Sequence, residues 1–93
     1  MRRYAAHYVC WQTIRPMSYV ETSEGIFNGV YPLETEPHST KFYNGILVPL
    51  PHGAIPLPSH SPADLCRMSA VIRPGSPFAL WQIHEDMARI VSH

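Results

Sequence analysis

Apolar and polar residues in the first half of the chain follow the spacing of β-strands. Residues 3–11 carry apolar or aromatic side chains at both odd and even positions, which predicts a strand covered on both faces. Residues 17–22 and 26–33 contain aromatic and β-branched residues and predict two further strands. The Ser-Glu-Gly sequence at 23–25 predicts a hairpin between them, and Pro16 is expected to break the chain before the second strand.

A fourth strand is expected over residues 40–48, after a polar connection at 34–39. The pair Asn44-Gly45 inside this strand has two interpretations. It is typical of a type I′ hairpin turn, but Gly45 can equally mark a bulge or a bend within one continuous strand. The sequence leaves both interpretations open.

The next part of the chain is expected to be a proline-rich connector that leads into a helix. Four prolines lie within residues 49–60. Because proline fixes φ and lacks an N–H group, we expect extended backbone there instead of a helix or a central strand. Ser61, Pro62 and Asp64 have the positions of an N-cap, a first helical residue and a capping acid, so a helix is predicted to begin at this point.

A second helix is predicted after the Pro-Gly pair at 74–75. The Ser-Pro sequence at 76–77 resembles a helix start. Phe78 and Trp81 lie beside the apolar stripe of this helix and give it more apolar surface than one small sheet needs. Phe78, Trp81 and Met87 are therefore the candidate interface residues, with Trp81 as the candidate anchor. The residues at helical spacing that form the stripe are Leu80, Ile83, Met87 and Ile90.

Together these elements predict one small domain of the mostly-β (α+β) class, spanning residues 1–93. We expect a small β-sandwich or open barrel of short strands over residues 1–48, the connector over 49–60, and one or two C-terminal helices over 61–93. A chain of this length buries a smaller share of its surface than a larger domain does, so its core is expected to be small.

The charge composition argues against nucleic acid and membranes as partners. Seven basic and seven acidic residues give a formal net charge of zero, and the basic residues are scattered, whereas phosphate binding needs clustered Lys and Arg. No apolar run is long enough to span a membrane and no signal peptide is recognisable. Cys10 and Cys66 lack disulfide or zinc spacing, so we expect a cytoplasmic protein with two free core thiols. Its neutral surface gives little protection against self-association.

Three segments of the first half share a further pattern. They are Arg3-Tyr-Ala-Ala-His-Tyr-Val9, residues 20–30 with Glu-Gly at 24–25, and Phe42-Tyr-Asn-Gly-Ile-Leu-Val-Pro49. They resemble the opening strand, the hairpin and the exit of the N-terminal composite domain of metal-dependent amidohydrolases, a small β-sandwich beside a catalytic barrel. A (β/α)8 barrel needs about 250 residues. The resemblance therefore implies a stand-alone composite domain that lacks the barrel.

The resemblance also implies that this chain is not an enzyme. Aligned from Pro49, the two ligand positions of the family's metal-binding His-x-His pair fall on Ile55 and Leu57, neither of which can bind a metal ion. We therefore expect no catalytic residue and no cofactor. Of the six histidines, His52 and His60 share the proline-rich loop and are the candidate metal ligands, although scattered histidines more often have packing or surface roles.

The leading functional hypothesis is a non-catalytic interaction module that self-associates as a homodimer. Its basis is the apolar surface that a barrel would cover in a full amidohydrolase. One alternative is an accessory subunit that completes a separately encoded amidohydrolase-type partner. Another is a ligand- or metal-binding protein that uses the His52–His60 loop. A role of the aromatic residues in stacking RNA bases is disfavoured, because interleaved Arg and Lys are lacking.

Overall fold

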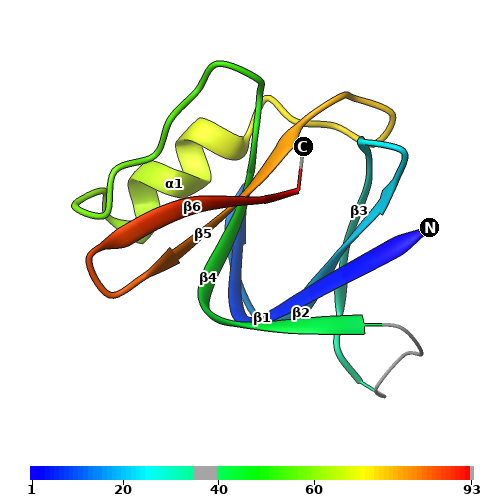
Figure 1. The fold of residues 1–93 in the computed structure, drawn as a ribbon, viewed down its shortest axis with the longest axis horizontal. Helices are drawn as coiled ribbons and strands as arrows, with labels where there is room; N and C mark the ends of the chain where they lie inside the picture. The colour runs from blue at the N-terminus through cyan, green and yellow to red at the C-terminus, as the bar shows by residue number, and fades with distance from the viewer. Residues whose placement is uncertain (35–39, 93) are drawn as a thin grey trace.

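A computed structural model describes residues 1–34 and 40–92 of the chain. It shows a six-stranded sheet in the order β3-β2-β1-β4-β5-β6, with one helix packed beside it (Figure 1). Strands β1 and β4 are parallel, and all other neighbouring strands are antiparallel. The elements are β1 (Arg2–Trp11), β2 (Thr13–Ser23), β3 (Ile26–Pro32), β4 (Thr40–Leu50), α1 (Pro62–Ser69), β5 (Ala79–His84) and β6 (Met87–Ser92).

The sheet curls until the start of β3 meets the segment that precedes β5. The N–H of Phe27 donates to the carbonyl of Ser76 over 2.9 Å, and the N–H of Gly75 donates to the carbonyl of Phe27 over 2.8 Å. The predicted mostly-β class is confirmed. All six described strands belong to this single curled sheet, so the two packed sheets of a β-sandwich are not observed among them. The curl gives the sheet an inner and an outer face.

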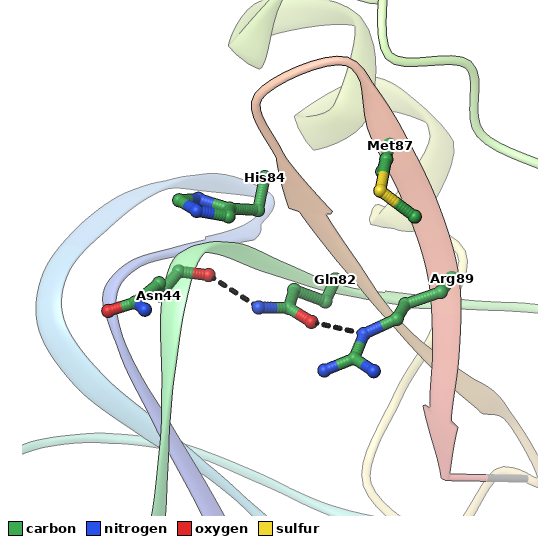
Figure 2. Close-up of a pocket in the computed structure, with 5 residues that line it drawn as sticks. All are labelled: Asn44, Gln82, His84, Met87 and Arg89. Carbon is green, nitrogen blue, oxygen red and sulfur yellow. Dashed lines mark hydrogen bonds between the residues drawn. The ribbon is translucent and has the colours of Figure 1, made fainter.

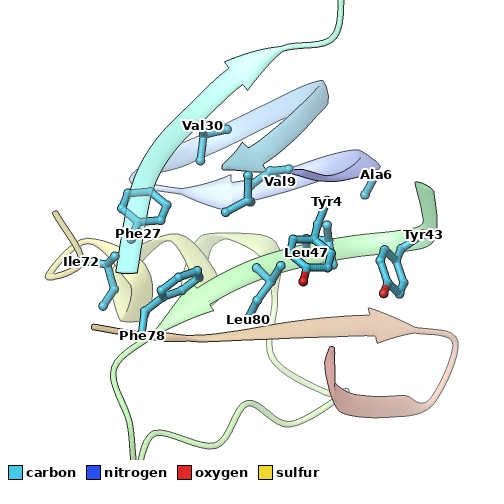
Figure 3. Close-up of a cluster of buried hydrophobic side chains, with 11 residues drawn as sticks. Tyr4, Ala6, Val9, Phe27, Val30, Tyr43, Leu47, Ile72, Phe78 and Leu80 are labelled. Atoms are coloured by element: carbon cyan, nitrogen blue, oxygen red, sulfur yellow. The ribbon is translucent and has the colours of Figure 1, made fainter. Parts of the chain in front are cut away.

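The inner face carries a cluster of buried apolar side chains (Figure 3). Phe27 of β3 meets Phe78 edge-on, with ring centroids 5.4 Å apart, and contacts Trp11 at 5.0 Å. The indole Nε1 of Trp11 donates to the carbonyl of Ile72 over 2.9 Å. Because each large buried side chain contributes about 1.5–3 kcal/mol, this cluster is the main stabilising element of the fold. Its members are Tyr4, Ala6, Val9, Val20, Phe27, Val30, Tyr43, Leu47, Ile72, Phe78 and Leu80.

Helix α1 covers part of the outer face and begins where the sequence predicts. The Ser61 hydroxyl accepts from the N–H of Asp64, and the Asp64 carboxylate accepts from the N–H of Ser61, each over 3.1 Å. This capping box satisfies N–H groups at the start of the helix. The hydrogen bonds to Ser61 also hold the pKa of Asp64 below its usual value. The outer cluster under α1 consists of Cys10, Val48, Leu50, Leu65, Cys66 and Ile83.

Aromatic side chains away from the inner cluster form a row across four strands. Tyr31 of β3 lies opposite Tyr19 of β2, with ring centroids 5.6 Å apart. Ala5 of β1 lies opposite Tyr19 on one side and opposite Phe42 of β4 on the other. His7 contacts the Phe42 ring edge-on at 5.0 Å. Cross-strand packing of this kind stabilises neighbouring strands and accounts for these exposed or half-buried rings.

The predicted break at Pro16 is wrong. Strand β2 runs through this residue, which lies opposite Tyr8 of β1. On the side of β2 opposite β1, strand β3 pairs only with residues from Ser18 onward. Among the described strands, Pro16 therefore has a neighbour on its β1 side and none on its other side. A proline is tolerated in a strand where its missing N–H has no ladder partner. The predicted hairpin at 23–25 is present, and both Glu24 and Gly25 have the positive φ of a type I′ turn.

The predicted second helix is also wrong, because residues 79–92 form the β5–β6 hairpin. The apolar stripe that suggested a helix also fits a strand that is covered on both faces. In a short apolar run, periodicity alone does not distinguish a helix from such a strand. Leu80 belongs to the inner cluster, whereas its neighbours Trp81 and Ile83 pack at the outer cluster. The turn has two residues and begins at Glu85, whose φ is +57°. Helix in the 61–93 segment is thus limited, within its described residues, to α1.

The proline-rich segment is largely irregular. Its first two residues, Pro49 and Leu50, extend β4 and pair with β5. Residues 51–61 contain neither helix nor strand. Two turns within them are closed by backbone hydrogen bonds, from Ala54 to Pro51 and from His60 to Leu57. This segment carries the chain from the end of β4 to the start of α1.

The two cysteines lie together in the outer cluster, and Cys10 is fully buried. Burial first, and the neighbouring Cys66 second, raise the pKa of the Cys10 thiol from 9.0 to about 12. We expect the free energy of unfolding to fall as the pH rises from 9.0 toward about 12. In that range the unfolded thiol ionises while the folded one stays protonated, so increasing pH favours unfolding.

Denaturant unfolding across that pH range checks this expectation, with Cys10→Ala as the reference. The variant should be less stable at neutral pH because of the lost packing, but its stability should fall less steeply with pH. Identical pH slopes for the two proteins would show that the thiol does not titrate as described.

Candidate functional site

The central structural feature of the candidate site is a bulge in β4 at Asn44-Gly45. Between the pairs Ala6–Tyr43 and Tyr8–Ile46, β1 advances by two residues and β4 by three. The strand then continues, so the pair forms a bulge and not a hairpin turn. Gly45 has a φ of +84°, and a Cβ atom there would lie 2.3 Å from the carbonyl oxygen of Ile83. The close approach of β4 to β5 at this point therefore requires glycine.

The bulge positions a chain of polar groups that ends at Arg89 of β6 (Figure 2). The carbonyl of Asn44 accepts a hydrogen bond from Nε2 of Gln82 over 2.8 Å. Oε1 of Gln82 in turn accepts from Nε of Arg89 over 2.7 Å. Gln82 is only 6% exposed, so both ends of its amide are satisfied as a buried polar group requires. Residues of three neighbouring strands thus form one hydrogen-bonded chain, which orients the exposed guanidinium group of Arg89 through its Nε.

Two adjoining hollows, of about 290 and 400 Å³, lie around this chain of hydrogen bonds and form what we call the groove. Lys41 enters it from β4, with its Nζ 5.4 Å from the centre of the Tyr43 ring. Two basic side chains and no acidic one line the groove within the described part of the chain. The lining residues are Lys41, Phe42, Tyr43, Asn44, Gln82, His84, Met87, Arg89, Ile90 and Val91.

The two cations of the groove, Lys41 and Arg89, take part in no ion pair among the described residues. Within residues 1–34 and 40–92 the ion pairs are Arg3–Glu21, Arg67–Asp64 and His84–Glu85. Neither Lys41 nor Arg89 belongs to one of them. The His84 contact, at 3.8 Å, is an ion pair only when the imidazole is protonated. The geometry suits the binding of an anion, and the described residues that line the groove include no Ser, Thr or Cys.

Strand β6 forms an open edge of the sheet. Among the described strands it pairs only with β5. In an antiparallel pair, hydrogen-bonded and non-bonded positions alternate. Because His84 and Met87 flank the two-residue turn as a bonded pair, we infer that Ala88 and Ile90 direct their N–H and C=O groups away from β5. These backbone groups are available to another strand.

A small apolar surface adjoins this edge on the outer face. Its hollow of about 290 Å³ lies between the turn at 52–55 and the β5–β6 hairpin. We call Ala54, Ile55, Trp81 and Ile90 the outer patch. Ile55 is 67% exposed and Ile90 38% exposed. The indole Nε1 of Trp81 is buried and has no hydrogen-bond partner in the described residues, which is energetically costly for a polar group.

The three candidate interface residues are not presented by one helix face, as predicted, but occupy three different environments. Phe78 is 1% exposed and belongs to the inner cluster, so its side chain is not on the surface. Met87 is 64% exposed at the far end of the groove. Trp81 is partly buried in the outer patch, and it alone of the three lies where the apolar surface meets the β6 edge.

The two candidate metal ligands have separate roles in the loop. His52 lies at the rim of the outer hollow. Nδ1 of His60 accepts a hydrogen bond from the N–H of Leu57 over 2.9 Å, and this contact stabilises the turn before α1. No group of three or more potential metal ligands gathers in the part of the chain that the structure describes. Ile55 and Leu57, at the positions aligned with the family's ligands, are both exposed. His38 lies outside the described residues.

Sequence reasoning missed the groove. Lys41, Gln82 and Arg89 are separated along the chain, and only the sheet order brings them together. One signal was present, because Gln82 is the only side chain with a hydrogen-bonding amide in the apolar run from residue 78 to residue 83. A lone polar residue in such a run indicates a buried hydrogen bond.

Comparison with known proteins places the chain in no family. No family model matches it, and neither the curated proteins nor the solved structures yield a match. The resemblance to the amidohydrolase composite domain therefore remains a prediction from the sequence. Among the described residues, no helix has the length and apolar character needed to cross a membrane.

Gly45→Ala should destabilise the protein more than Gly53→Ala does. Both glycines have positive φ, so both variants carry the left-handed strain of about 1–2 kcal/mol. Only at Gly45 does the new methyl group meet backbone, and overpacking of this kind costs about 1–3 kcal/mol more. A Cβ at Gly53 has no heavy atom within 4 Å. Urea unfolding of both variants measures the difference, and equal losses of stability would contradict the role given to Gly45.

Proposed function

We propose that this protein is a non-catalytic interaction module that self-associates through β6. The observation that supports this function best is the open β6 edge beside the exposed outer patch. Free N–H and C=O groups on an edge strand are a template for pairing with a further strand. An adjoining apolar surface adds the hydrophobic contribution that backbone pairing alone does not supply.

The two edges of the sheet differ in how they are protected. At β3 the start of the strand is covered by residues 75–78, the middle is distorted by a bulge next to Gly29, and the end is Pro32. Bulges and prolines are common devices against edge-to-edge pairing. Strand β6 also has a bulge, between Ile90 and Ser92 near its end, but its residues from Met87 to Ile90 pair regularly with β5. It contains no proline, and its one charged residue, Arg89, is engaged by Gln82. Pairing between two copies is therefore favoured at β6.

A second copy is the occupant that fits this edge best. Two β6 strands can meet antiparallel across a two-fold axis, so that each contributes the same surface. The formal net charge of zero means that no overall charge repulsion opposes the encounter. In that arrangement Ile90 of each copy lies near the junction and Trp81 lies beside it. Trp81 is thus the proposed anchor of the interface, because tryptophan is a frequent source of binding energy at interfaces.

We place this module in the cytoplasm. The support is the pair of buried free cysteines, since proteins of oxidising compartments more commonly carry their cysteines as disulfides.

Sedimentation equilibrium of the wild type, Ile90→Lys and Val71→Lys tests the proposal. We expect the wild type to dimerise with a dissociation constant in the micromolar range, about 1–100 μM. Ile90→Lys should weaken the dimer by at least about tenfold, because it places a charge on the junction. Val71→Lys is the matched control. Val71 is 65% exposed, follows α1 and does not line the outer hollow, so its variant should dimerise like the wild type.

A wild type that stays monomeric throughout this range would overturn self-association, as would equal dimer affinity for all three proteins. The accessory-subunit alternative predicts a monomer that binds an amidohydrolase-type partner through the same edge. Ile90→Lys would then weaken the hetero-complex instead.

A further inference from the structure

We propose that the groove between β4 and the β5–β6 hairpin is a binding site for a small carboxylate that carries an apolar group. Its basis is the hydrogen-bonded Arg89, the second cation at Lys41 and an apolar wall formed by the exposed Met87 side chain beside Arg89. This site lies within one copy of the chain and shares only Ile90 with the outer patch. It goes beyond the proposed self-association.

Arg89 is held in advance in an orientation that suits an anion. Its Nε is occupied by Gln82, and Gln82 is itself held by the backbone of Asn44 (Figure 2). This leaves the two terminal nitrogens of the guanidinium, whose parallel N–H groups match the two oxygens of a carboxylate. A free arginine side chain loses conformational entropy when it binds a ligand. Here the buried amide of Gln82 has already removed part of that cost.

Lys41 adds a second positive charge on the opposite strand of the same groove. Its ammonium group lies over the Tyr43 ring, and it lines one hollow together with Arg89. Because no acidic side chain lines the groove in the described residues, the two cations reinforce each other's field instead of being neutralised. An anion is therefore attracted, whereas a cation of the same shape is repelled.

The remaining walls of the groove define the rest of the ligand. The apolar wall belongs to the hollow of about 290 Å³, where the exposed side chain of Met87 lies beside Arg89. The hollow of about 400 Å³, which contains Lys41, is the more polar of the two. The hollows, about 290 and 400 Å³, are at the lower end of the usual range for small-molecule sites. A carboxylate on an aromatic or branched aliphatic group of about ten heavy atoms satisfies both the charge and the volume.

The test uses benzoate as the probe, with benzamide as its neutral analogue of nearly the same shape and inorganic phosphate as an anion without an apolar part. Titration followed by ¹H–¹⁵N NMR should show saturable shifts for benzoate, with a dissociation constant of about 0.1–1 mM. The shifts should include the Nε–H of Arg89 and the side-chain amide of Gln82. Benzamide and phosphate should each bind at least about tenfold more weakly.

Variants separate binding at this site from general attraction to the surface. Arg89→Gln should weaken benzoate binding by about tenfold or more, because both the charge and the bidentate contact are lost. Lys41→Gln removes only the second charge and should weaken it about threefold. Arg73→Gln is the matched control, since Arg73 is exposed and lies outside the groove. It should leave benzoate affinity unchanged.

Several results would overturn the proposal. One is no saturable shift with benzoate, and another is equal binding of benzoate and benzamide. Phosphate binding as tight as benzoate would exclude a role for the apolar wall. If the NMR spectrum of Arg89→Gln shows that this variant is unfolded, the test rests on Lys41→Gln. The Lys41 side chain makes no hydrogen bond among the described residues, so we expect Lys41→Gln to fold. Unchanged affinity in that folded variant would refute the site.

Discussion

The close approach of β4 to β5 at Gly45 is the constraint on which the rest of this structure depends. A side chain at this position would overlap with the backbone of Ile83, so the two strands can pair as they do only because Gly45 has none. The bulge it creates adds one residue to β4 relative to β1. Bulges bend a strand and increase its local twist. The bend carries β4 from its pairing with β1 into its pairing with β5, and the curl of the sheet follows from it.

The same bulge links the fold to its candidate functional surfaces. It gives the Asn44 carbonyl to Gln82, and through Gln82 it fixes Arg89 on β6. The β5–β6 hairpin then has two different faces. Its inner face contributes Leu80 to the core and Arg89 to the groove. Its outer face contributes Trp81 and Ile90 to the outer patch. A six-residue strand at the edge of the sheet thus carries both the proposed anion-binding group and part of the proposed interface.

Local signals in the sequence predicted the local parts of the fold. The strands of the first half, the turn at 24–25 and the capping box at Ser61 and Asp64 depend on neighbouring residues and were predicted correctly, apart from the break expected at Pro16. The β5–β6 hairpin was not, because both of its faces are covered. An apolar run of this kind has the composition of a buried strand and the spacing of a helix at once. Only the presence of β4 as a pairing partner selects the strand.

The groove was beyond the reach of the sequence for a related reason. Its polar chain joins residues 44, 82 and 89, and their meeting depends on the register of β5 against both β4 and β6. The sequence did leave open that Asn44-Gly45 is a bulge, and this bulge presents the Asn44 carbonyl to Gln82. The candidate interface at Trp81 was chosen from a helical stripe that does not exist. The residue nevertheless adjoins the open edge, because it faces outward from β5.

Hydrogen exchange of the β6 amides, measured by NMR in dilute and in concentrated solution, tests the role of this strand most directly. The amides of Met87 and Arg89 are bonded within the hairpin and should be protected at both concentrations. The amides of Ala88 and Ile90 point away from β5, and they should exchange rapidly in dilute solution and become protected in concentrated solution. This alternation would place a second strand on the β6 edge. Fast exchange of Ala88 and Ile90 at every concentration would contradict it.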